Sequence, residues 1–567
     1  MVKIKKGHIF LITILALGFI LRIWGINFGL PYQYHQDEPM AINHAISYGS
    51  GDFNPHYFQL PPLIGYILFF LYAIFYLLGN LFNYFKDSDS FLTLFLQNPT
   101  AFYLIARVFL GLIPGCISIF LTFKVTQIIS NKKSGYLAAL FLAVSFLHVR
   151  DCHYAYHDVG LILFLLLAFL FSFKYLSTDK LSNMIWAGVF AGFATGFKYN
   201  GVLIIAPILL GPWLYKKDKT MFIGGTLRVN FTFLIFFALS YALSNPYSIL
   251  DIKTFLASVF SESKAHVYMG WLYHISYSAF EGMGLFMAII SIAGFIIFLF
   301  SKDVRRKLIA LFILLSYLSI VFFGQRHERY ILPILPFLII AASICIVDFF
   351  NKFLQKPWKK YFFILTVSIL IAPPLIKSVY SDILFSRKDT RTQATEWIED
   401  NLPQGSAIAL DYHFFSPRLL QSPQQIREKI NFLENKNEFG GRMRKAKILK
   451  VLSEREKSYN IFFLGNDKEK KFIFSSSPQL PFELDKLYEN KIAYVIIHLD
   501  YPSQNYPNSN FKNSLIKKAE LIKVFNPYKT QNIDLKHRFS TTAAPFSNKE
   551  IFGRNNNGPI LLIYRLK

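Results

Sequence analysis

The sequence has very little cysteine. Its 567 residues include three cysteines, Cys116, Cys152 and Cys345. Two of them lie inside apolar runs, so neither a disulfide framework nor a cysteine-based metal site is expected. Charged residues are also scarce, at 17%, whereas hydrophobic residues make up 53% of the chain. This composition is typical of a membrane protein that crosses the bilayer several times.

Acidic residues are few compared with basic ones. The chain has 35 Asp and Glu and 60 Lys and Arg, which gives a formal net charge of +25. Many of the basic residues lie in short clusters between apolar runs, as membrane topology signals do. We therefore expect no nucleic acid as a partner. The basic residues of the C-terminal part leave contact with anionic lipid or polymer open.

Long apolar runs recur through roughly the first two thirds of the chain, each near the length of a membrane span. The first follows a basic start and has no small-residue cleavage site after it. We therefore interpret it as a transmembrane helix and not as a signal peptide. The candidate segments are 8–29, 61–82, 104–129, 135–149, 158–176, 183–197, 200–215, 229–248, 282–300, 308–323, 331–350 and 361–379.

From Arg387 onward charges are dense and apolar runs are short. This change predicts a transmembrane domain over 1–384 and a water-facing domain over 385–567. In the second domain "ENKIAYVIIHLDY" and "GPILLIYRLK" are expected strands, whereas "TQATEWIEDNL" and "SLIKKAELIKVF" have helical spacing. The predicted fold class is an α-helical polytopic membrane protein with a C-terminal α/β domain.

The basic clusters predict a topology, because Lys and Arg accumulate in cytoplasmic loops. If 61–82 crossed the membrane, every cluster from Lys132 onward would lie opposite to the N-terminal one. If 61–82 instead dips into the membrane as a hairpin and returns, all clusters share one side. The clusters are Lys3/Lys5/Lys6, Lys132/Lys133, Lys174/Lys180, Lys216/Lys217/Lys219, Lys302/Arg305/Arg306/Lys307 and Lys352/Lys356/Lys359/Lys360.

We therefore expect one long outer loop over 30–103 that carries an embedded hairpin, with Pro61 and Pro62 at its entry. About eleven spans then remain. The N-terminus is predicted to be cytoplasmic and the C-terminal domain extracytoplasmic, in the plasma or inner membrane of the cell.

The first outer loop contains an acidic pair in "YHQDEPMAINHAISYG". Asp37 or Glu38 can cap a short helix whose first turn contains Pro39. The helix dipole favours an ionised carboxylate at this place, and such a group can act as a general base or a cation ligand. The two interpretations, cap and base, are both open at this point.

The next predicted outer loop, "HVRDCHYAYHD", contains Arg150, Asp151 and Asp158. If the segment is helical, the two acids lie on one side, two turns apart. His153 and His157 have helical spacing but lack a clear third ligand, so a zinc site is not favoured. Their other interpretation is hydrogen bonding at the membrane interface.

Cations complete the predicted outer face. Lys198 in "GFKYNG" and Arg329 in "QRHERY" lie where apolar segments meet the surface, and could hold a phosphate at headgroup level. Lys198 could equally be an ordinary snorkelling lysine. Acids beside cations suggest that a carboxylate takes a proton from an acceptor while cations hold a leaving phosphate. Outside the cell the activated donor must come with the membrane, and a lipid phosphate is the natural carrier.

Several segments, in order, resemble the protein O-mannosyltransferase-like glycosyltransferases (family 39, GT-C fold), which include bacterial aminoarabinose transferases of lipid A. "GLPYQYHQDEPMAINHA" and "GDFNPHYFQLPPLIGYILF" resemble their first outer loop, and "FLHVRDCHYAYHDVGLILF" their second. "AGFATGFKYNGVLIIAP", "NPYSILDIKTFL", "RHERYILPILPFLIIAA" and "DTRTQATEWIEDNLPQGSAIALD" resemble later family segments. In the second loop Tyr156, His157 and Gly160 replace more usual residues.

The resemblance implies an enzyme that transfers a sugar from a polyprenyl phosphate to a lipid, glycan or protein acceptor on the outer face, with inversion. It implies that Asp37 is the base, with Glu38 beside it. It further implies that Asp151 or Asp158, with His56, places the acceptor or a cation. Whether a divalent metal takes part is left open. The donor phosphate would be held by Lys198, Arg329 and Arg150.

Two other functions are consistent with a polytopic chain. A transporter of lipid-linked glycans would be expected to show repeated halves with broken helices at mid-membrane, and no such repeat is visible. A non-catalytic scaffold or sensor would leave the acids and cations of the outer face without a role.

Overall fold

The computed structural model describes residues 6–215, 222–263, 271–323, 327–353, 358–411, 415–435, 441–465, 478–499, 509–530 and 545–567. Of the predicted basic clusters, Lys216/Lys217/Lys219 and the residues Lys3, Lys5 and Lys356 therefore lie outside the described residues. Two compact units are distinguished. The first comprises 1–26, 40–72 and 104–382, and the second comprises 27–39, 73–103 and 383–567.

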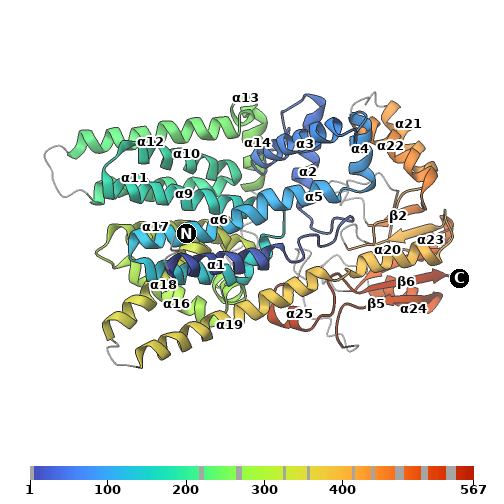
Figure 1. Cartoon of the computed structure of the whole chain (residues 1–567). Helices are drawn as coiled ribbons and strands as arrows, with labels where there is room; N and C mark the ends of the chain where they lie inside the picture. Colours follow the sequence, from blue (N-terminus) through green and yellow to red (C-terminus); the bar gives the residue numbers. More distant parts are fainter. Residues whose placement is uncertain are drawn as a thin grey trace. The chain divides into compact units, whose positions relative to one another are not determined.

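All twelve apolar segments predicted from the sequence are helical in the structure (Figure 1). By length and composition alone, six of the helical stretches in the described residues could cross a membrane. The helices are α1 (Lys6–Ile23), α3 (Leu63–Leu81), α6 (Ile113–Ile129), α7 (Lys132–Val144), α9 (His157–Thr178), α10 (Leu181–Phe197), α11 (Ile205–Tyr215), α12 (Phe222–Ser244), α16 (Leu285–Leu299), α17 (Val304–Phe323), α18 (Leu335–Phe353) and α19 (Lys359–Ser386).

Short elements join these helices. They include α2 (Glu38–Ser47), η1 (Tyr48–Ser50), α4 (Ser88–Gln97), α5 (Thr100–Arg107), η2 (Val108–Leu112), α8 (Phe146–Asp151), η3 (Tyr199–Ile204), α13 (Tyr247–Leu250), α14 (Ile252–Ser263), η4 (His274–Ala279), α15 (Phe280–Met283) and η5 (Glu328–Ile334).

Glycines allow α10 and α12 to pack closely. Gly188, Gly192 and Gly196 recur every four residues along α10, which places them on one face. A Cβ atom added at Gly188 would lie 2.5 Å from the backbone oxygen of Phe233, and one at Gly196 would lie 2.5 Å from Ser244 Oγ. Small residues at this spacing let helix backbones approach each other, as is common between membrane helices.

Contacts of the basic residues define one end of the helical bundle in the first unit. The Arg305 guanidinium, at the start of α17, donates to the backbone oxygen of Ile128 at 2.9 Å. Arg306 pairs with Asp348, near the end of α18, at 3.1 Å. Phe10 of α1 packs against Tyr136 of α7 with ring centroids 5.4 Å apart. The starts of α1, α7 and α17 and the end of α18 therefore lie together, and basic residues of α7, α17 and α18 are gathered at this end, which we call the basic end.

The predicted hairpin within 61–82 is not present. The segment instead forms the single helix α3 after the Pro61–Pro62 pair. No proline and no charge interrupts residues 63–81, so nothing in the local sequence breaks the helix. A turn follows at Asn83, which has a positive φ of 56°, and α4 starts after it with Asp87 as its N-cap.

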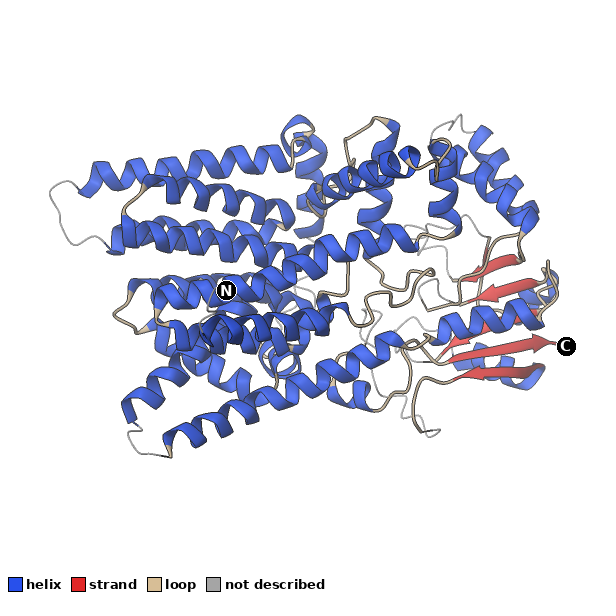
Figure 2. Ribbon diagram, viewed as in Figure 1, coloured by secondary structure: helices blue, strands red, loops and turns tan. Residues whose placement is uncertain are grey.

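The second unit contains a sheet, drawn in red in Figure 2. It has six strands in the order β3-β2-β1-β4-β6-β5. Strands β1 (Ala407–Leu410), β2 (Asn460–Leu464), β3 (Gln479–Leu480) and β4 (Tyr494–His498) run parallel, whereas β6 (Leu561–Leu566) and β5 (Ala519–Phe525) continue the sheet antiparallel. The accompanying helices are α20 (Thr390–Asn401), α21 (Pro423–Asn435), α22 (Gly441–Arg455), α23 (Leu484–Glu489), α24 (Ser509–Lys518) and α25 (Asn548–Phe552).

The predicted helix in "SLIKKAELIKVF" is only half right. It ends at Lys518, and Ala519–Phe525 is the edge strand β5. Pairing with β6 explains the change, because Glu520 and Arg565 lie opposite each other and form an ion pair at 2.7 Å. Tertiary pairing here overrides the local helical spacing.

Parts of the first loop belong to the second unit. Tyr34 lies under the Arg391 guanidinium, 3.9 Å from the ring centroid, and its hydroxyl hydrogen-bonds Thr392. Asp89 of α4 forms an ion pair with Arg444 of α22. The loop therefore supplies residues to the compact unit that contains the sheet.

Candidate active site

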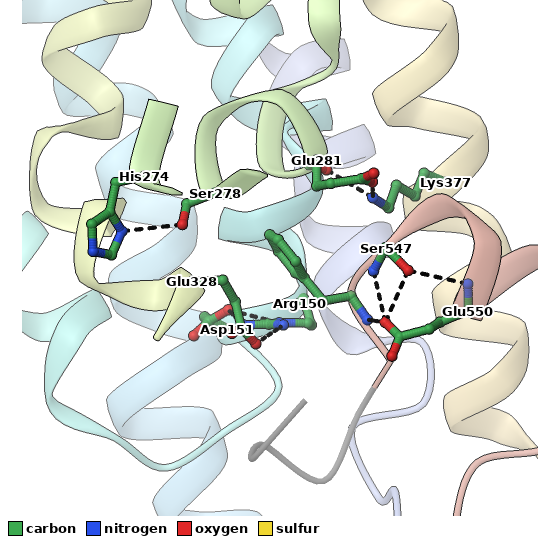
Figure 3. A network of polar contacts seen from close by, with 10 residues as sticks. Arg150, Asp151, His274, Ser278, Glu281, Glu328, Lys377, Ser547 and Glu550 are labelled. Atoms are coloured by element: carbon green, nitrogen blue, oxygen red, sulfur yellow. Dashed lines mark hydrogen bonds and ion pairs between the residues drawn. The ribbon is translucent and has the colours of Figure 1, made fainter. Parts of the chain in front are cut away.

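A buried arginine joins two acids at the end of the bundle opposite to the basic end, because α8 follows α7 and η5 follows α17. Figure 3 shows Arg150 between Asp151 and Glu328. Arg150 pairs with Asp151 at 2.8 Å and with Glu328 at 2.9 Å. The side chains of the three residues are 0%, 9% and 4% exposed. Burial of this kind makes the ion pairs interdependent, because removing one partner leaves an uncompensated charge.

The local backbone explains how Arg150 reaches this place. Helix α7 ends at Val144, since Ser145 has an extended backbone with ψ of 114°, and the short helix α8 then turns away. Segment 148–158 is therefore not one helix, so the condition under which its two acids share one helical side is not met: residues 152–156 separate α8 from α9. Arg22 of α1 anchors α8, since it hydrogen-bonds the His148 ring at 2.8 Å and the backbone oxygen of Ala143 at 3.0 Å.

A second ion pair lies at the same end of the bundle. Asp158, in the first turn of α9, accepts a hydrogen bond of 2.7 Å from the Lys198 ammonium, at the C-cap of α10. The Lys198 side chain is 15% exposed and that of Asp158 is 2% exposed. The ammonium also lies 5.1 Å from the centroid of the Tyr330 ring. Helices α9 and α10 are antiparallel neighbours (Figure 1), which brings these two residues together.

Arg329 adds a third cation. Its guanidinium lies 4.3 Å from the centroid of the Tyr156 ring, between α8 and α9. Burial raises the pKa of Asp151 to about 6, although Arg150 opposes the rise, and Asp158 adds to it. The influence of Asp158 and Arg329 on this carboxyl shows that both ion pairs belong to one electrostatic cluster. We call Arg150, Asp151, Asp158, Lys198, Glu328 and Arg329 the charged cluster.

The first-loop acids are placed by α2. Asp37 is half-buried and precedes the helix, and its backbone N–H donates to the His35 ring at 3.3 Å. Glu38 is fully buried in the first turn. Both carboxylates lie where the helix dipole favours negative charge. Asp37 and Glu38 fall at the boundary between the compact units, so their proposed catalytic roles remain predictions.

His56 lies apart from the charged cluster. Its ring hydrogen-bonds Asp52 at 2.9 Å and is well exposed, with a side-chain exposure of 65%. Asn54 between them donates to Asp251 at 3.0 Å. His56 therefore belongs to a surface group that links the first loop to the segment after α13.

Glu328 was not among the predicted site residues, although it bonds Arg150 directly. In the sequence it is only one charge of "QRHERY", and nothing local says which of its neighbours turns inward. Tyr156 and Tyr330 were missed in the same way, since an aromatic near an apolar run is usually a packing residue. The adjacent cations are the signal that could have identified both.

In the part of the chain that the structure describes, no group of three or more His, Cys, Asp or Glu is arranged to hold a metal. His153 instead contacts two backbone oxygens, those of Val149 at 3.0 Å and Trp24 at 2.9 Å. Burial lowers its pKa to about 4. His274 of η4 hydrogen-bonds Ser278, and Lys377 of α19 pairs with Glu281 at 2.5 Å (Figure 3). These contacts hold helical segments in place and do not bring metal ligands together.

Residues 90–241 match the family described as dolichyl-phosphate-mannose-protein mannosyltransferase. The apo oligosaccharyltransferase of Archaeoglobus fulgidus has a TM-score of 0.51 at 11% identity, over 88% of this chain and 70% of that one. ArnT from Cupriavidus metallidurans has a TM-score of 0.44 at 10% identity, over 98% and 97%. Arabinofuranosyltransferase AftD from Mycobacteria has 0.44 at 11%, over 99% and 40%. No curated protein sequence matches.

The family match and the shared fold confirm the class predicted from the sequence. The chain is a multi-pass membrane glycosyltransferase with a GT-C-like fold, similar to the protein mannosyltransferases. The matched stretch includes Arg150, Asp151, Asp158 and Lys198, and therefore most of the charged cluster.

Proposed function

We propose that this enzyme transfers a sugar from a polyprenyl-phosphate donor to an acceptor on the extracytoplasmic face of the cell membrane, with inversion at the anomeric carbon. Asp37 is the proposed base and Glu38 its neighbour. Lys198 and Arg329 hold the donor phosphate, and Asp158 orients Lys198. In this proposal the domain formed by 385–567 also lies outside the membrane.

The observation that carries this proposal is the charged cluster at one end of the bundle. Three cations and three acids from α8, α9, α10 and η5 meet there, with most side chains buried. Ionisable groups at membrane depth are costly, so such a gathering is a functional hypothesis by default. The family description names a dolichyl-phosphate sugar donor, whose phosphate is the anion that such cations fit.

The cations of the cluster differ in how accessible they are. Arg150 is enclosed by Asp151 and Glu328, so its main contribution is to hold these two carboxylates in place. Lys198 has one carboxylate partner and is partly exposed. It is therefore better placed than Arg150 to contact a phosphate oxygen, with Arg329 supplying further positive charge from the start of η5.

The bonds, the electron pair and the proton of the proposed transfer can all be accounted for with Asp37, the phosphate and the cations. The acceptor nucleophile forms a bond to the anomeric carbon while the bond from that carbon to the phosphate oxygen breaks. The electron pair leaves on the phosphate, whose charge the cations stabilise. The proton of the acceptor passes to the Asp37 carboxylate, which the start of α2 keeps ionised. Attack from the face opposite to the phosphate gives inversion.

The test is transfer from a panel of radiolabelled polyprenyl-phosphate sugars in membranes that contain wild type or Asp37→Asn. We expect wild type to consume one donor and Asp37→Asn to be about 10²- to 10⁴-fold slower. Asp89→Asn is the matched control, because Asp89 is an exposed first-loop acid paired with Arg444. If wild type consumes no donor, the enzyme does not use this donor class. Full activity of Asp37→Asn with loss in Asp158→Asn would move the base to the second loop.

A further inference from the structure

A small pocket lies beside the charged cluster, between α2, the turn that ends at Pro62, the start of α3 and the first residue of α9. Its lining is mostly apolar, and its polar members are His44, Tyr57 and His157. The volume of about 20 Å³ leaves room for one water-sized group. The pocket therefore cannot hold a whole sugar ring, but it can hold a single hydroxyl or hydroxymethyl group.

The hydrogen bonds of His157 define which of its ring nitrogens can accept a hydrogen bond from a ligand. This side chain is 97% buried, since its relative exposure is 3%. Its ring hydrogen-bonds the backbone of Pro61, and because proline has no backbone N–H, the bonded group is the Pro61 carbonyl. A carbonyl accepts, so the ring nitrogen that faces it carries the proton. The other nitrogen, Nδ1, is buried and has no partner among the described residues, so Nε2 makes the bond to Pro61.

It follows that Nδ1 of the neutral ring is a hydrogen-bond acceptor. A second ring proton would place another positive charge beside Lys198 and Arg329. The neighbouring carboxylate repeats the pattern: Oδ1 of Asp158 accepts from Lys198, whereas Oδ2 is buried and has no partner in the described part of the chain. Two consecutive residues therefore each present a buried acceptor without a donor, and such groups are costly unless something pairs with them.

We infer that the pocket receives one hydroxyl-bearing carbon of the sugar in the lipid-linked donor, and that the hydroxyl donates to Nδ1 of His157. This inference rests on the proposed function. The apolar lining suits the C–H side of a sugar carbon, and the acceptor nitrogen suits its O–H. The donor sugar is the expected occupant because it is bonded to the phosphate, and Lys198, the proposed phosphate ligand, is paired with the residue next to His157. His157 is then a residue that determines donor specificity.

Two variants separate this role from a structural one. His157→Asn keeps an acceptor near the position of Nδ1 but cannot reach Pro61 as the ring does. His157→Gln keeps a donor toward Pro61 but has no acceptor at the δ position. We expect kcat/KM for the donor to fall about 10-fold or more in His157→Gln, and to stay within about threefold of wild type in His157→Asn. His8→Gln, an exposed residue of α1, is the matched control.

Donor analogues that each lack one hydroxyl give a second, independent measurement on wild type alone. We expect one analogue to lose about 10-fold or more in kcat/KM with wild type, and to lose nothing further in His157→Gln. The inference is overturned if Asn is the impaired variant and Gln the active one, because the ring then only supports Pro61. It is also overturned if wild type treats all analogues alike, since the pocket then holds water. If wild type consumes no donor, the proposed function itself fails.

Discussion

The two ends of the helical bundle in the first unit both carry ion pairs, but of different kinds. At the basic end Arg305 pairs with Asp303, and Arg306 with Asp348, with side chains 20–46% exposed. At the other end Arg150 joins Asp151 and Glu328, with side chains no more than 9% exposed. Exposed pairs contribute about 0–1 kcal/mol to stability, and breaking a buried one costs about 3–5 kcal/mol.

We infer from this difference that the two ends have different roles. The basic end has an excess of cations close to water, which is enough to orient helices in a membrane. The charged cluster instead has equal numbers of acids and cations, which are largely removed from water. Such an arrangement has a desolvation cost, so a gain in stability alone does not explain it. In the proposed function, the need to bind and release a phosphate at a fixed position accounts for this arrangement.

The largest expected difference between the two ends is in stability. Arg150→Met leaves Asp151 and Glu328 buried without their cation, so we expect the free energy of unfolding to fall by about 3–5 kcal/mol. Arg305→Met, the matched change at the basic end, should cost no more than about 1 kcal/mol. Denaturation of both purified variants in detergent measures this. Equal losses would show that burial does not distinguish the two ends.

The next effect is on donor binding. Lys198→Met removes the proposed phosphate ligand, and loss of a charged hydrogen bond of about 1.5–3 kcal/mol should raise KM for the donor about 10- to 100-fold. Lys174→Met removes a cation near the basic end, where Lys174 lies over the Phe171 ring, and should leave KM unchanged. Steady-state kinetics on both variants decides. An unchanged KM in Lys198→Met would assign that lysine to snorkelling.

Of the two ends, the charged cluster is the one where a pH effect near pH 6 is expected. The pKa of Asp151 is raised to about 6 by burial, so its pairing with Arg150 weakens as the pH falls below 6 and activity should decline there. The folded-state pKa lies above the usual 3.8, so this carboxyl favours folding most below pH 3.8, and that contribution is lost as the pH rises through 6. Activity and stability should therefore move in opposite directions between pH 4 and pH 6.

The control for this effect is Asp151→Asn, which cannot titrate. Its activity should be lower than that of wild type at pH 7 and should lack the decline centred near pH 6. Rate profiles from pH 5 to pH 8 in both proteins make the comparison. A decline that persists unchanged in Asp151→Asn would assign it to another group.

The smallest effect is expected where the exposed pair joins α17 to α18. Arg306→Met, Asp348→Asn and the double variant should each change the free energy of unfolding by less than about 1 kcal/mol. The coupling energy between the two substitutions should also be below about 1 kcal/mol. A double-mutant cycle in detergent measures the coupling. A coupling above about 2 kcal/mol would place this pair with the buried ones.

Most of the helices could be predicted because the apolar run that forms a membrane helix is a local property of the sequence. The predicted hairpin in 61–82 was wrong, because it was inferred from the side of the membrane on which distant charges should lie and not from the segment itself, which forms one helix. Ala519–Phe525 was missed because pairing with β6, which comes later in the chain, makes it a strand.

Five of the six residues of the charged cluster were predicted as candidate site residues, all except Glu328, but their pairing was not predicted. Arg150 and Glu328 are 178 residues apart, and only the antiparallel packing of the helices brings them together. Arg150 was predicted to hold phosphate. Its two carboxylate partners instead suggest that it holds Asp151 and Glu328 in place, a role that the sequence around Arg150 did not indicate. Asp37 stays a prediction, because its role depends on substrates rather than on neighbours.

The proposed function requires the charged cluster to lie at the outer end of the bundle and the basic end to face the cytoplasm. Side-specific labelling tests it most directly, in a chain whose three native cysteines are replaced and which then carries either Ser50→Cys, in the exposed turn after α2, or Lys132→Cys at the start of α7. With an impermeant maleimide on intact cells, we predict labelling of the Ser50→Cys chain and labelling of the Lys132→Cys chain only after permeabilisation. Labelling of the Lys132→Cys chain in intact cells would contradict the claim.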